Sequence, residues 1–206
     1  MMDRNLGATS ATPGEVGSLG LLYQWGRKDP FLNSSSVSSA TQAVSTGTWS
    51  TSSESITPAK AEQNPTTFYT GWDGNYMPDG SWASTKTAYD PCPAGWRVPD
   101  GGTSGIWATA KGSSDSFSIN SGFYGLNFGG VFGSAETIWY PASGYLYVDS
   151  VLYGVGSDGY YWSVTPVPSF DSGAYFLYFG SNGDVNPSNS FDRSDGGQSV
   201  VSKNKI

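Results

Sequence analysis

The run YDPCPAGWRVP, Tyr89–Pro99, constrains the fold more than any other part of the chain. Each of its three prolines fixes the backbone φ angle, removes a hydrogen-bond donor and pushes the preceding residue toward an extended conformation. Neither a helix nor a central strand can continue through such a run. Gly95 gives the backbone freedom to turn, and Trp96 and Val98 supply apolar surface. The run therefore predicts a rigid structural corner packed on the core.

The composition is typical of a loop-rich β or α+β protein. Only 13% of the 206 residues are charged, 15% are aromatic, and the chain has 28 glycines and 12 prolines. This length suffices for one buried core, and no linker or charge block divides it. We therefore expect a single domain over residues 1–206.

Charge and missing residue types exclude several classes of function. The formal net charge of −7 repels a polyanion, so we expect no nucleic-acid partner. The chain has no histidine, which rules out a Ser-His-Asp triad and a His-ligated zinc site. Its single cysteine, Cys92, cannot form an intrachain disulfide, and we expect it to be buried. No apolar stretch is long enough to span a membrane.

Short strands and turns dominate the second half of the predicted structure. Apolar or alternating runs are separated by four turn-forming pairs, Gly129-Gly130, Ser143-Gly144, Asp158-Gly159 and Asn182-Gly183. We therefore expect an antiparallel sheet built mostly from this half. The best helix candidate follows Thr103 or Ser104 and ends near Gly112.

The first half is predicted to be less regular. Residues 33–57 are rich in serine and threonine and predict a long surface excursion. The apolar residues from Leu19 to Trp25 fit either buried extended structure or one helical turn.

Seven blocks of the chain, in order, carry a family resemblance. They are DRNLGA (Asp3–Ala8), GLLYQWGRKDPF (Gly20–Phe31), YDPCPAGWRVP (Tyr89–Pro99), WYPASGY (Trp139–Tyr145), GYYWSVTP (Gly159–Pro166), AYFLYF (Ala174–Phe179) and RSDGG (Arg193–Gly197). Together they resemble the Fibrobacter succinogenes major paralogous domain, an extracellular module of Bacteroidetes-type surface proteins. That family is similar to the formylglycine-generating (sulfatase-modifying) and C-type-lectin-like folds.

The resemblance implies a fold and a location, and the chain departs from the family pattern at one point. It implies an α+β, C-type-lectin-like domain with a twisted antiparallel sheet, one or two short helices and extensive ordered loops. It also implies an extracellular or outer-membrane location, reached with an export signal outside this chain. Family members often carry a second cysteine in a terminal strand, and residues 198–206 contain none. The family has no uniform activity to transfer.

Catalysis and metal binding are the weaker hypotheses. Formylglycine-type chemistry needs paired cysteines, whereas two facing carboxylates for glycoside hydrolysis need no fixed spacing and stay open. We expect no catalytic residues, no metal ligands and no cofactor. A structural calcium ion is left open because acidic clusters occur at Asp73/Asn75/Asp79, Asp149/Asp158 and Asp192/Asp195.

Aromatic residues provide the candidate binding site. Residues 68–82 alternate aromatic residues with turn formers, and such a loop cannot easily bury every ring. Exposed Trp and Tyr rings offer flat apolar area with a polar edge. We therefore predict Trp72, Tyr76 and Trp82 as ligand contacts, against the alternative that they pin the loop to the core.

Three arginines within the family-like blocks, Arg4, Arg97 and Arg193, are predicted to be structural, together with Trp96. An arginine in an apolar block usually pairs with a carboxylate or binds loop carbonyls. Asp3 and Asp90 are candidate partners.

The predicted function is a non-catalytic recognition or adhesion module of a bacterial surface protein, such as a lipoprotein or a pilus-associated protein. Its partner would be a glycan or protein at the cell surface. The alternatives are a calcium-independent carbohydrate-binding module and a glycoside-acting enzyme with paired carboxylates.

Overall fold

A computed structural model shows a chain made mostly of strands, with two short helices in an α+β-like arrangement. It describes residues 4–31, 49–70, 76–111, 117–120, 125–129, 137–198 and 202–203. The helices are α1 (Pro58–Gln63) and α2 (Ile106–Lys111), and one 3-10 turn lies at Val16–Ser18. No helix within these ranges is long and apolar enough to cross a membrane.

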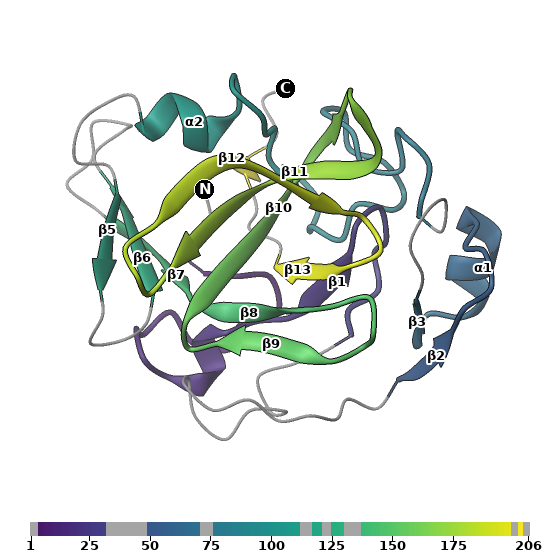
Figure 1. The fold of residues 1–206 in the computed structure, drawn as a ribbon, viewed down its shortest axis with the longest axis horizontal. Coiled ribbons are helices and arrows are strands. Elements are labelled where there is room, and N and C mark those ends of the chain that lie inside the picture. The colour runs from purple at the N-terminus through teal and green to yellow at the C-terminus, as the bar shows by residue number, and fades with distance from the viewer. Residues whose placement is uncertain are drawn as a thin grey trace.

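A seven-stranded sheet forms the centre of the molecule (Figure 1). Its order is β1-β13-β8-β10-β11-β12, and β9 pairs with β8. The strands are β1 (Leu22–Gln24), β8 (Ser143–Leu146), β9 (Leu152–Val155), β10 (Asp158–Val167), β11 (Phe170–Gly180), β12 (Val185–Asp192) and β13 (Gly196–Gln198). All of them except β1 come from the second half, as predicted. The prediction of an antiparallel sheet is corrected in part: β10 runs parallel to β8 and β13, so the sheet is mixed.

Three smaller sheets surround the main one. β2 (Ser50–Ser52) pairs in parallel with β3 (Thr67–Tyr69), and β4 (Trp96–Arg97) pairs antiparallel with β14 (Ser202–Lys203). The third sheet contains β5 (Phe117–Asn120), β6 (Gly125–Gly129) and β7 (Thr137–Pro141).

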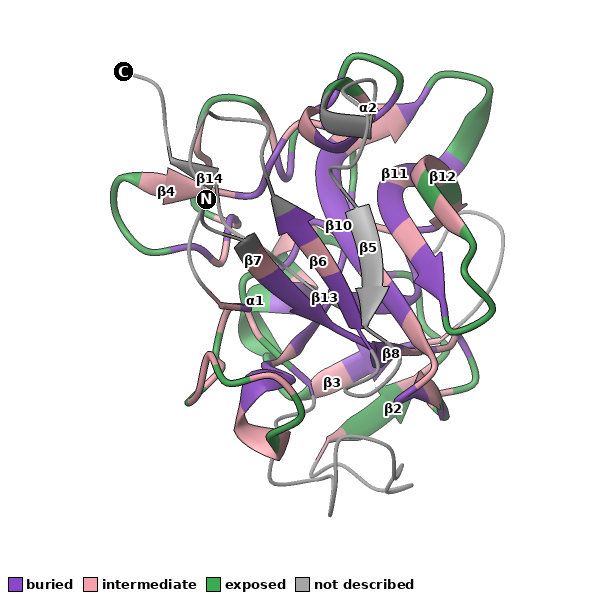
Figure 2. Ribbon diagram, turned by 90° about the vertical axis from the view of Figure 1, so that its left-hand side faces the viewer, coloured by how far each residue is buried: buried purple, intermediate pink, exposed green. Residues whose placement is uncertain are grey.

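The paired strands β10 and β11 form the centre of the core because both of their faces are apolar. Side chains alternate between the faces of a strand. Trp162 and its cross-strand partner Phe176 pack into one cluster, while Tyr161 and its partner Leu177 pack into another that also holds Trp107 of α2. Figure 2 shows the long buried stretch along β10.

Two of the four predicted turns are wrong, and Gly130 of the pair Gly129-Gly130 lies outside the described residues. Ser143-Gly144 lies within β8, and Asp158-Gly159 begins β10. In both places sheet pairing overrides the local preference for a turn. Asn182-Gly183 does form the connection between β11 and β12, where Gly183 has a φ of 93°.

The helix predictions had mixed outcomes. The predicted helix is confirmed as α2, although Gly112 lies outside the described residues. Helix α1 was not predicted, yet Thr57 caps its N-terminus by accepting a hydrogen bond from the Lys60 amide, and Pro58 opens its first turn. The predicted excursion over 33–57 is corrected at its end, where Ser50–Ser52 form β2; residues 32–48 lie outside the described ranges.

In the proline-rich corner, Asp90 organises the backbone. Its carboxylate accepts hydrogen bonds from the Cys92 and Val98 amides and pairs with Lys86 at 2.9 Å. Cys92 is buried, which confirms the prediction. Gly95 turns the chain with a φ of 80°.

Arg97 has a different carboxylate partner from the one considered from the sequence. It pairs with Asp100 and donates to the Val98 carbonyl, whereas Asp90 is engaged by Lys86. The partly buried ring of Trp96 packs against the core. Arg4 is half-buried, and Asp3 lies outside the described residues.

Candidate functional site

The predicted aromatic loop is only partly available to a ligand. Trp72 lies outside the described residues. Trp82 was predicted as a contact residue, and this is wrong: its side chain is 1% exposed, its ring packs on Trp25 at 5.7 Å, and its indole N–H donates to the Tyr89 carbonyl. The alternative, that an aromatic ring pins the loop to the core, holds for Trp82. Tyr76 is half-buried and lies at the surface of the loop.

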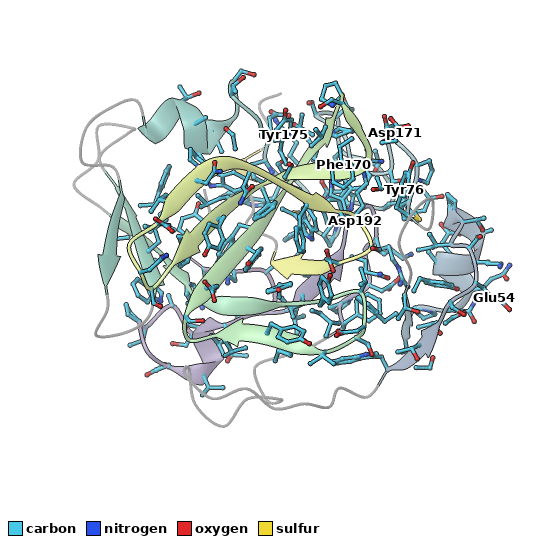
Figure 3. All side chains as sticks on the ribbon, viewed as in Figure 1. Glu54, Tyr76, Phe170, Asp171, Tyr175 and Asp192 are labelled. Carbon is cyan, nitrogen blue, oxygen red and sulfur yellow. The ribbon has the colours of Figure 1, made fainter. Side chains whose placement is uncertain are left out.

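The end of the β10–β11 hairpin lies beside this loop. The register of the pair shifts between Trp162 and Pro166 and again before Val167, which is typical of a bulge that bends the hairpin. Phe170 at the tip is 40% exposed. Tyr76 of the loop and Asp171, which follows the turn of the hairpin, line the same cleft (both are labelled in Figure 3).

An open cleft of about 530 Å³ separates the loop from the hairpin. We call it the Tyr76 cleft, and its lining residues are Tyr76, Pro78, Asp79, Pro166, Val167, Pro168, Asp171 and Arg193. Three of these are prolines, whose fixed φ angles limit the movement of both walls. The cleft is therefore shaped largely before any ligand arrives.

Arg193 provides the positive charge of the cleft. Its side chain is 1% exposed; Nε donates to the Gly173 carbonyl, and Nη1 donates to the Met77 carbonyl and lies 2.6 Å from an Asp79 carboxylate oxygen. Bonds to two carbonyls and one carboxylate are the kind of structural tie expected of this arginine. The tie joins the loop that carries Met77 and Asp79 to the hairpin strand that carries Gly173.

Two rings flank the Arg193 guanidinium. Its carbon lies 4.5 Å from the centroid of the Trp25 ring and 5.1 Å from that of the Tyr76 ring. Both distances are within the range of cation–π attraction. The buried Arg193 guanidinium therefore holds the Tyr76 ring in position, and this ring loses little conformational entropy when a ligand binds.

The cleft can offer a ligand both polar and flat apolar contacts. The Asp79 side chain is 73% exposed and Asp171 is exposed, so both carboxylates can accept hydrogen bonds. Among the described residues, no group of three acidic or cysteine side chains is arranged to hold a metal ion. Of the candidate calcium ligands, Asp73 and Asn75 lie outside the described ranges.

A second aromatic surface lies on the main sheet, away from the predicted loop in sequence. We define the tyrosine face by the residues Tyr145, Tyr147, Tyr153, Tyr160 and Phe191. The Tyr145 ring lies between 4.3 and 6.1 Å from each of the other four ring centroids. Tyr153 is 42% exposed, and the other four are half-buried.

Asp195 lies beneath the tyrosine face. It is 1% exposed, and neither carboxylate oxygen has a hydrogen-bond partner of good geometry among the described residues. Burial, reinforced by the neighbouring charges of Asp192 and Asp149, raises the pKa of Asp195 to about 8, and a hydrogen bond from the Val148 backbone partly opposes this rise. The Asp195 carboxyl group therefore carries a proton at neutral pH.

Sequence reasoning missed the tyrosine face because its residues come from different strands. Tyr145 and Tyr160 were visible only as members of strand-like runs, and their shared face depends on the pairing of β8 with β10. A usable signal was present in the sequence. Tyr145 and Tyr147 are two residues apart and so lie on one face of an extended chain, and Tyr153 lies opposite Tyr145 once β8 and β9 form a hairpin.

Comparison of the chain with protein-family models, curated proteins and solved structures found no match. The family resemblance therefore stays a prediction that depends on the seven sequence blocks.

Proposed function

We propose that the protein is a non-catalytic recognition module that binds a glycan or protein ligand in the Tyr76 cleft. The cleft itself is the observation that supports this most. It combines about 530 Å³ of open volume with a ring, three prolines and two accessible carboxylates. Binding sites for sugars and peptides combine flat apolar surface with a few polar groups that fix orientation in this way.

The ties around Arg193 support binding by a preformed site. The guanidinium joins the walls of the cleft through Met77, Asp79 and Gly173, and it holds the Tyr76 ring. A preformed site loses less entropy on binding than one that must be ordered by its ligand.

We also propose a C-type-lectin-like fold and a place at the bacterial cell surface, in a lipoprotein or a pilus-associated protein. The seven family-like blocks support both. The strand-rich α+β architecture with long loops is compatible with this proposal.

A glycan array probed with the whole chain, with and without EDTA, tests the proposal. We expect binding that is unchanged by EDTA and at least tenfold weaker in Tyr76→Ala. Tyr89→Ala is the matched control, because Tyr89 is also half-buried but does not line the cleft. Equal binding by Tyr76→Ala and the native chain would exclude the cleft as the site.

If the array shows no glycan bound, the ligand would be a protein. Cross-linking from a photoreactive group placed at the exposed residue Phe170 beside the cleft would then be expected to capture it. A partner captured equally well by the Tyr76→Ala variant would contradict the proposal.

The second candidate is a glycoside-acting enzyme, favoured by one observation. Asp79 and Asp171 both line the Tyr76 cleft, and glycoside hydrolysis commonly uses two carboxylates that flank the scissile bond. Release of reducing sugar from a bound glycan, lost in Asp171→Asn, would replace the recognition proposal with this one. We expect no release above the blank.

A further inference from the structure

We infer that the ligand of the Tyr76 cleft is an uncharged hexopyranose glycan, whose hydroxyl groups accept a hydrogen bond from Arg193 and donate one to Asp171. This inference rests on the function proposed above for the cleft, and it narrows the ligand from glycans or proteins to one chemical class. Four observations lead to it: a guanidinium nitrogen without a partner, a carboxylate without a partner, the balance of charge in the cleft and the size of the cleft.

The Arg193 guanidinium has one nitrogen left for a ligand. Nε donates to the Gly173 carbonyl, while Nη1 donates to the Met77 carbonyl and pairs with Asp79. Nη2 makes no hydrogen bond to any described residue, and unlike the unpartnered Nε of Arg27 it is not fully enclosed by protein. Because Arg193 lines the cleft, Nη2 can donate to a ligand oxygen there.

The Asp171 carboxylate is free to accept hydrogen bonds from a ligand. The residue lies near the start of β11, is exposed and lines the cleft. Within the described ranges its side chain has neither a hydrogen bond nor an ion pair. An ionised carboxylate can only accept hydrogen bonds, and a guanidinium can only donate them. A ligand that satisfies both groups must therefore accept and donate, as the hydroxyl groups of a sugar do.

The charges of the cleft favour an uncharged ligand. The Asp79 side chain is 73% exposed and Asp171 is exposed, so a carboxylate or sulfate group would meet two like charges in the cleft. The net charge of −7 adds to the repulsion of anions. A cationic group would instead meet the Arg193 guanidinium, which keeps its charge at all relevant pH values. Acidic and basic sugars are therefore both disfavoured.

The size of the cleft favours a glycan over a folded protein. Its volume of about 530 Å³ lies within the range of roughly 300–1,000 Å³ that is typical of small-molecule sites. A stable protein interface instead uses about 20–30 residues on each side, far more than line this cleft. The exposed part of the Tyr76 ring and the rings of Pro78, Pro166 and Pro168 offer apolar contacts to the C–H groups of a sugar. A short stretch of glycan therefore matches the cleft better than a protein surface does.

The test is a calorimetric titration of the whole chain at pH 7 with oligosaccharides that differ in charge. The neutral probes are cellohexaose, maltohexaose, mannohexaose and galactohexaose; the anionic probe is hexagalacturonate, and the cationic probe is the glucosamine hexamer. We expect saturable binding of at least one neutral probe, and binding of both charged probes that is weaker by about tenfold or more. A charged probe that binds as tightly as the best neutral one, or no saturable binding of any neutral probe, would overturn the inference.

Methylation of the bound oligosaccharide tests the hydrogen bond to Asp171. A per-O-methylated probe keeps its acceptor oxygens but has no hydroxyl donors, so it should bind about tenfold more weakly than the unmodified probe. Equal binding of the two probes would show that the ligand donates nothing to the cleft, and the inference would fail.

Asp171→Asn tests the same contact from the side of the protein. This variant should bind the neutral probe about tenfold more weakly, because a charged acceptor is lost, and hexagalacturonate about threefold more tightly, because a like charge is removed. Glu54→Gln is the matched control, because it also removes one negative charge but lies beside α1, paired with Lys60 (Figure 3). Unchanged binding of the neutral probe by an Asp171→Asn variant that unfolds at the native temperature would refute the inference.

Tyr76→Ala separates this inference from the proposed function. If a charged probe or a protein ligand binds the native chain and loses affinity in Tyr76→Ala, the cleft is a recognition site for a different ligand, and only the inference fails. If Tyr76→Ala binds every ligand of the native chain equally well, the function proposed for the cleft fails too.

Discussion

The Tyr76 cleft and the tyrosine face each hold one charged or chargeable side chain beneath aromatic rings, but only the first of these side chains has several hydrogen-bond and ion-pair partners. Arg193 donates to two carbonyls and a carboxylate and contacts two rings. Asp195 has rings above it and no hydrogen-bond partner of good geometry among the described residues. The difference teaches that rings tolerate a buried cation far better than a buried anion, because the faces of the rings are negative.

The two regions should therefore respond differently to mutation and to pH. The buried cation stabilises the fold by joining segments that are distant in sequence. The buried carboxyl group is a cost to the fold whenever it is ionised.

The largest effect is expected for Arg193→Met. This change leaves the Gly173 and Met77 carbonyls without donors and removes the cation from the Trp25 ring, so we expect a loss of about 3–5 kcal/mol in the free energy of unfolding. Urea unfolding measures it. Lys60→Met is the control: it breaks an exposed ion pair with Glu54 and should cost less than about 1 kcal/mol. Similar losses in the two variants would show that burial of Arg193 does not matter.

The next largest effect concerns the strand that carries Tyr145. Gly144 has a φ of 69°, and an added Cβ would overlap the Tyr153 carbonyl oxygen on the neighbouring strand. Gly144→Ala should therefore cost about 3 kcal/mol, since backbone strain and overlap combine.

Gly183→Ala is the matched comparison for that change. Gly183 has a φ of 93°, and an added Cβ would meet no atom within 4 Å, so only the backbone strain of about 1–2 kcal/mol is expected. Equal losses at the two glycines would mean that β8 and β9 can separate without cost, and the tyrosine face would then lack a rigid base.

The pH dependence of stability should distinguish the two regions further. The pKa of Asp195 is raised by burial from 3.8 to about 8 in the folded chain, so the folded state retains a proton that the unfolded state has released between these values. Stability should fall as the pH rises through this window, by about 1.4 kcal/mol per pH unit, or about 2–3 kcal/mol from pH 5 to pH 7. Below pH 4 and above pH 8 this contribution is constant.

Asp195→Asn isolates that contribution. Urea unfolding of the variant at pH 5 and pH 7 should show a smaller fall in stability than the native chain by the same 2–3 kcal/mol. Parallel curves for the native chain and the variant would show that Asp195 is solvated or paired.

The smallest effect is expected for Asp79→Asn. The Asp79 carboxylate is 73% exposed, so solvent screens its attraction to Arg193, and the loss should stay below about 1 kcal/mol. Thermal unfolding at low and high salt measures it. A loss comparable to that of Arg193→Met would mean that the carboxylate, not the rings and carbonyls, holds the buried cation.

Features that depend on local sequence were predicted well. Asn182-Gly183 turns the chain between two strands, and the apolar segment after Ser104 forms α2. Cys92 is buried within its proline-rich corner. In each case the residues concerned, or their immediate neighbours, set the backbone geometry or the preference for burial.

Features that depend on distant partners were not predicted. The sequence could not distinguish an exposed Trp82 from a buried one, because its burial requires Trp25 to lie against it. Asp158-Gly159 has the composition of a turn, but pairing with Phe179 and Gly180 on β11 makes it the start of a strand. Asp195 looked like an ordinary turn aspartate until the sheet placed it under the rings.

The amino-acid sequence by itself determined the broad class of this protein: a histidine-free, acidic, strand-rich chain with a rigid proline corner, in which a His-based active site is excluded. Only the tertiary structure decided which aromatic rings face solvent and which charged groups have partners. The physical reason is that burial and pairing are set by residues far apart in the chain: Arg193 meets Met77 and Trp25, and Tyr145 meets Tyr160 and Phe191, only when the sheet has formed.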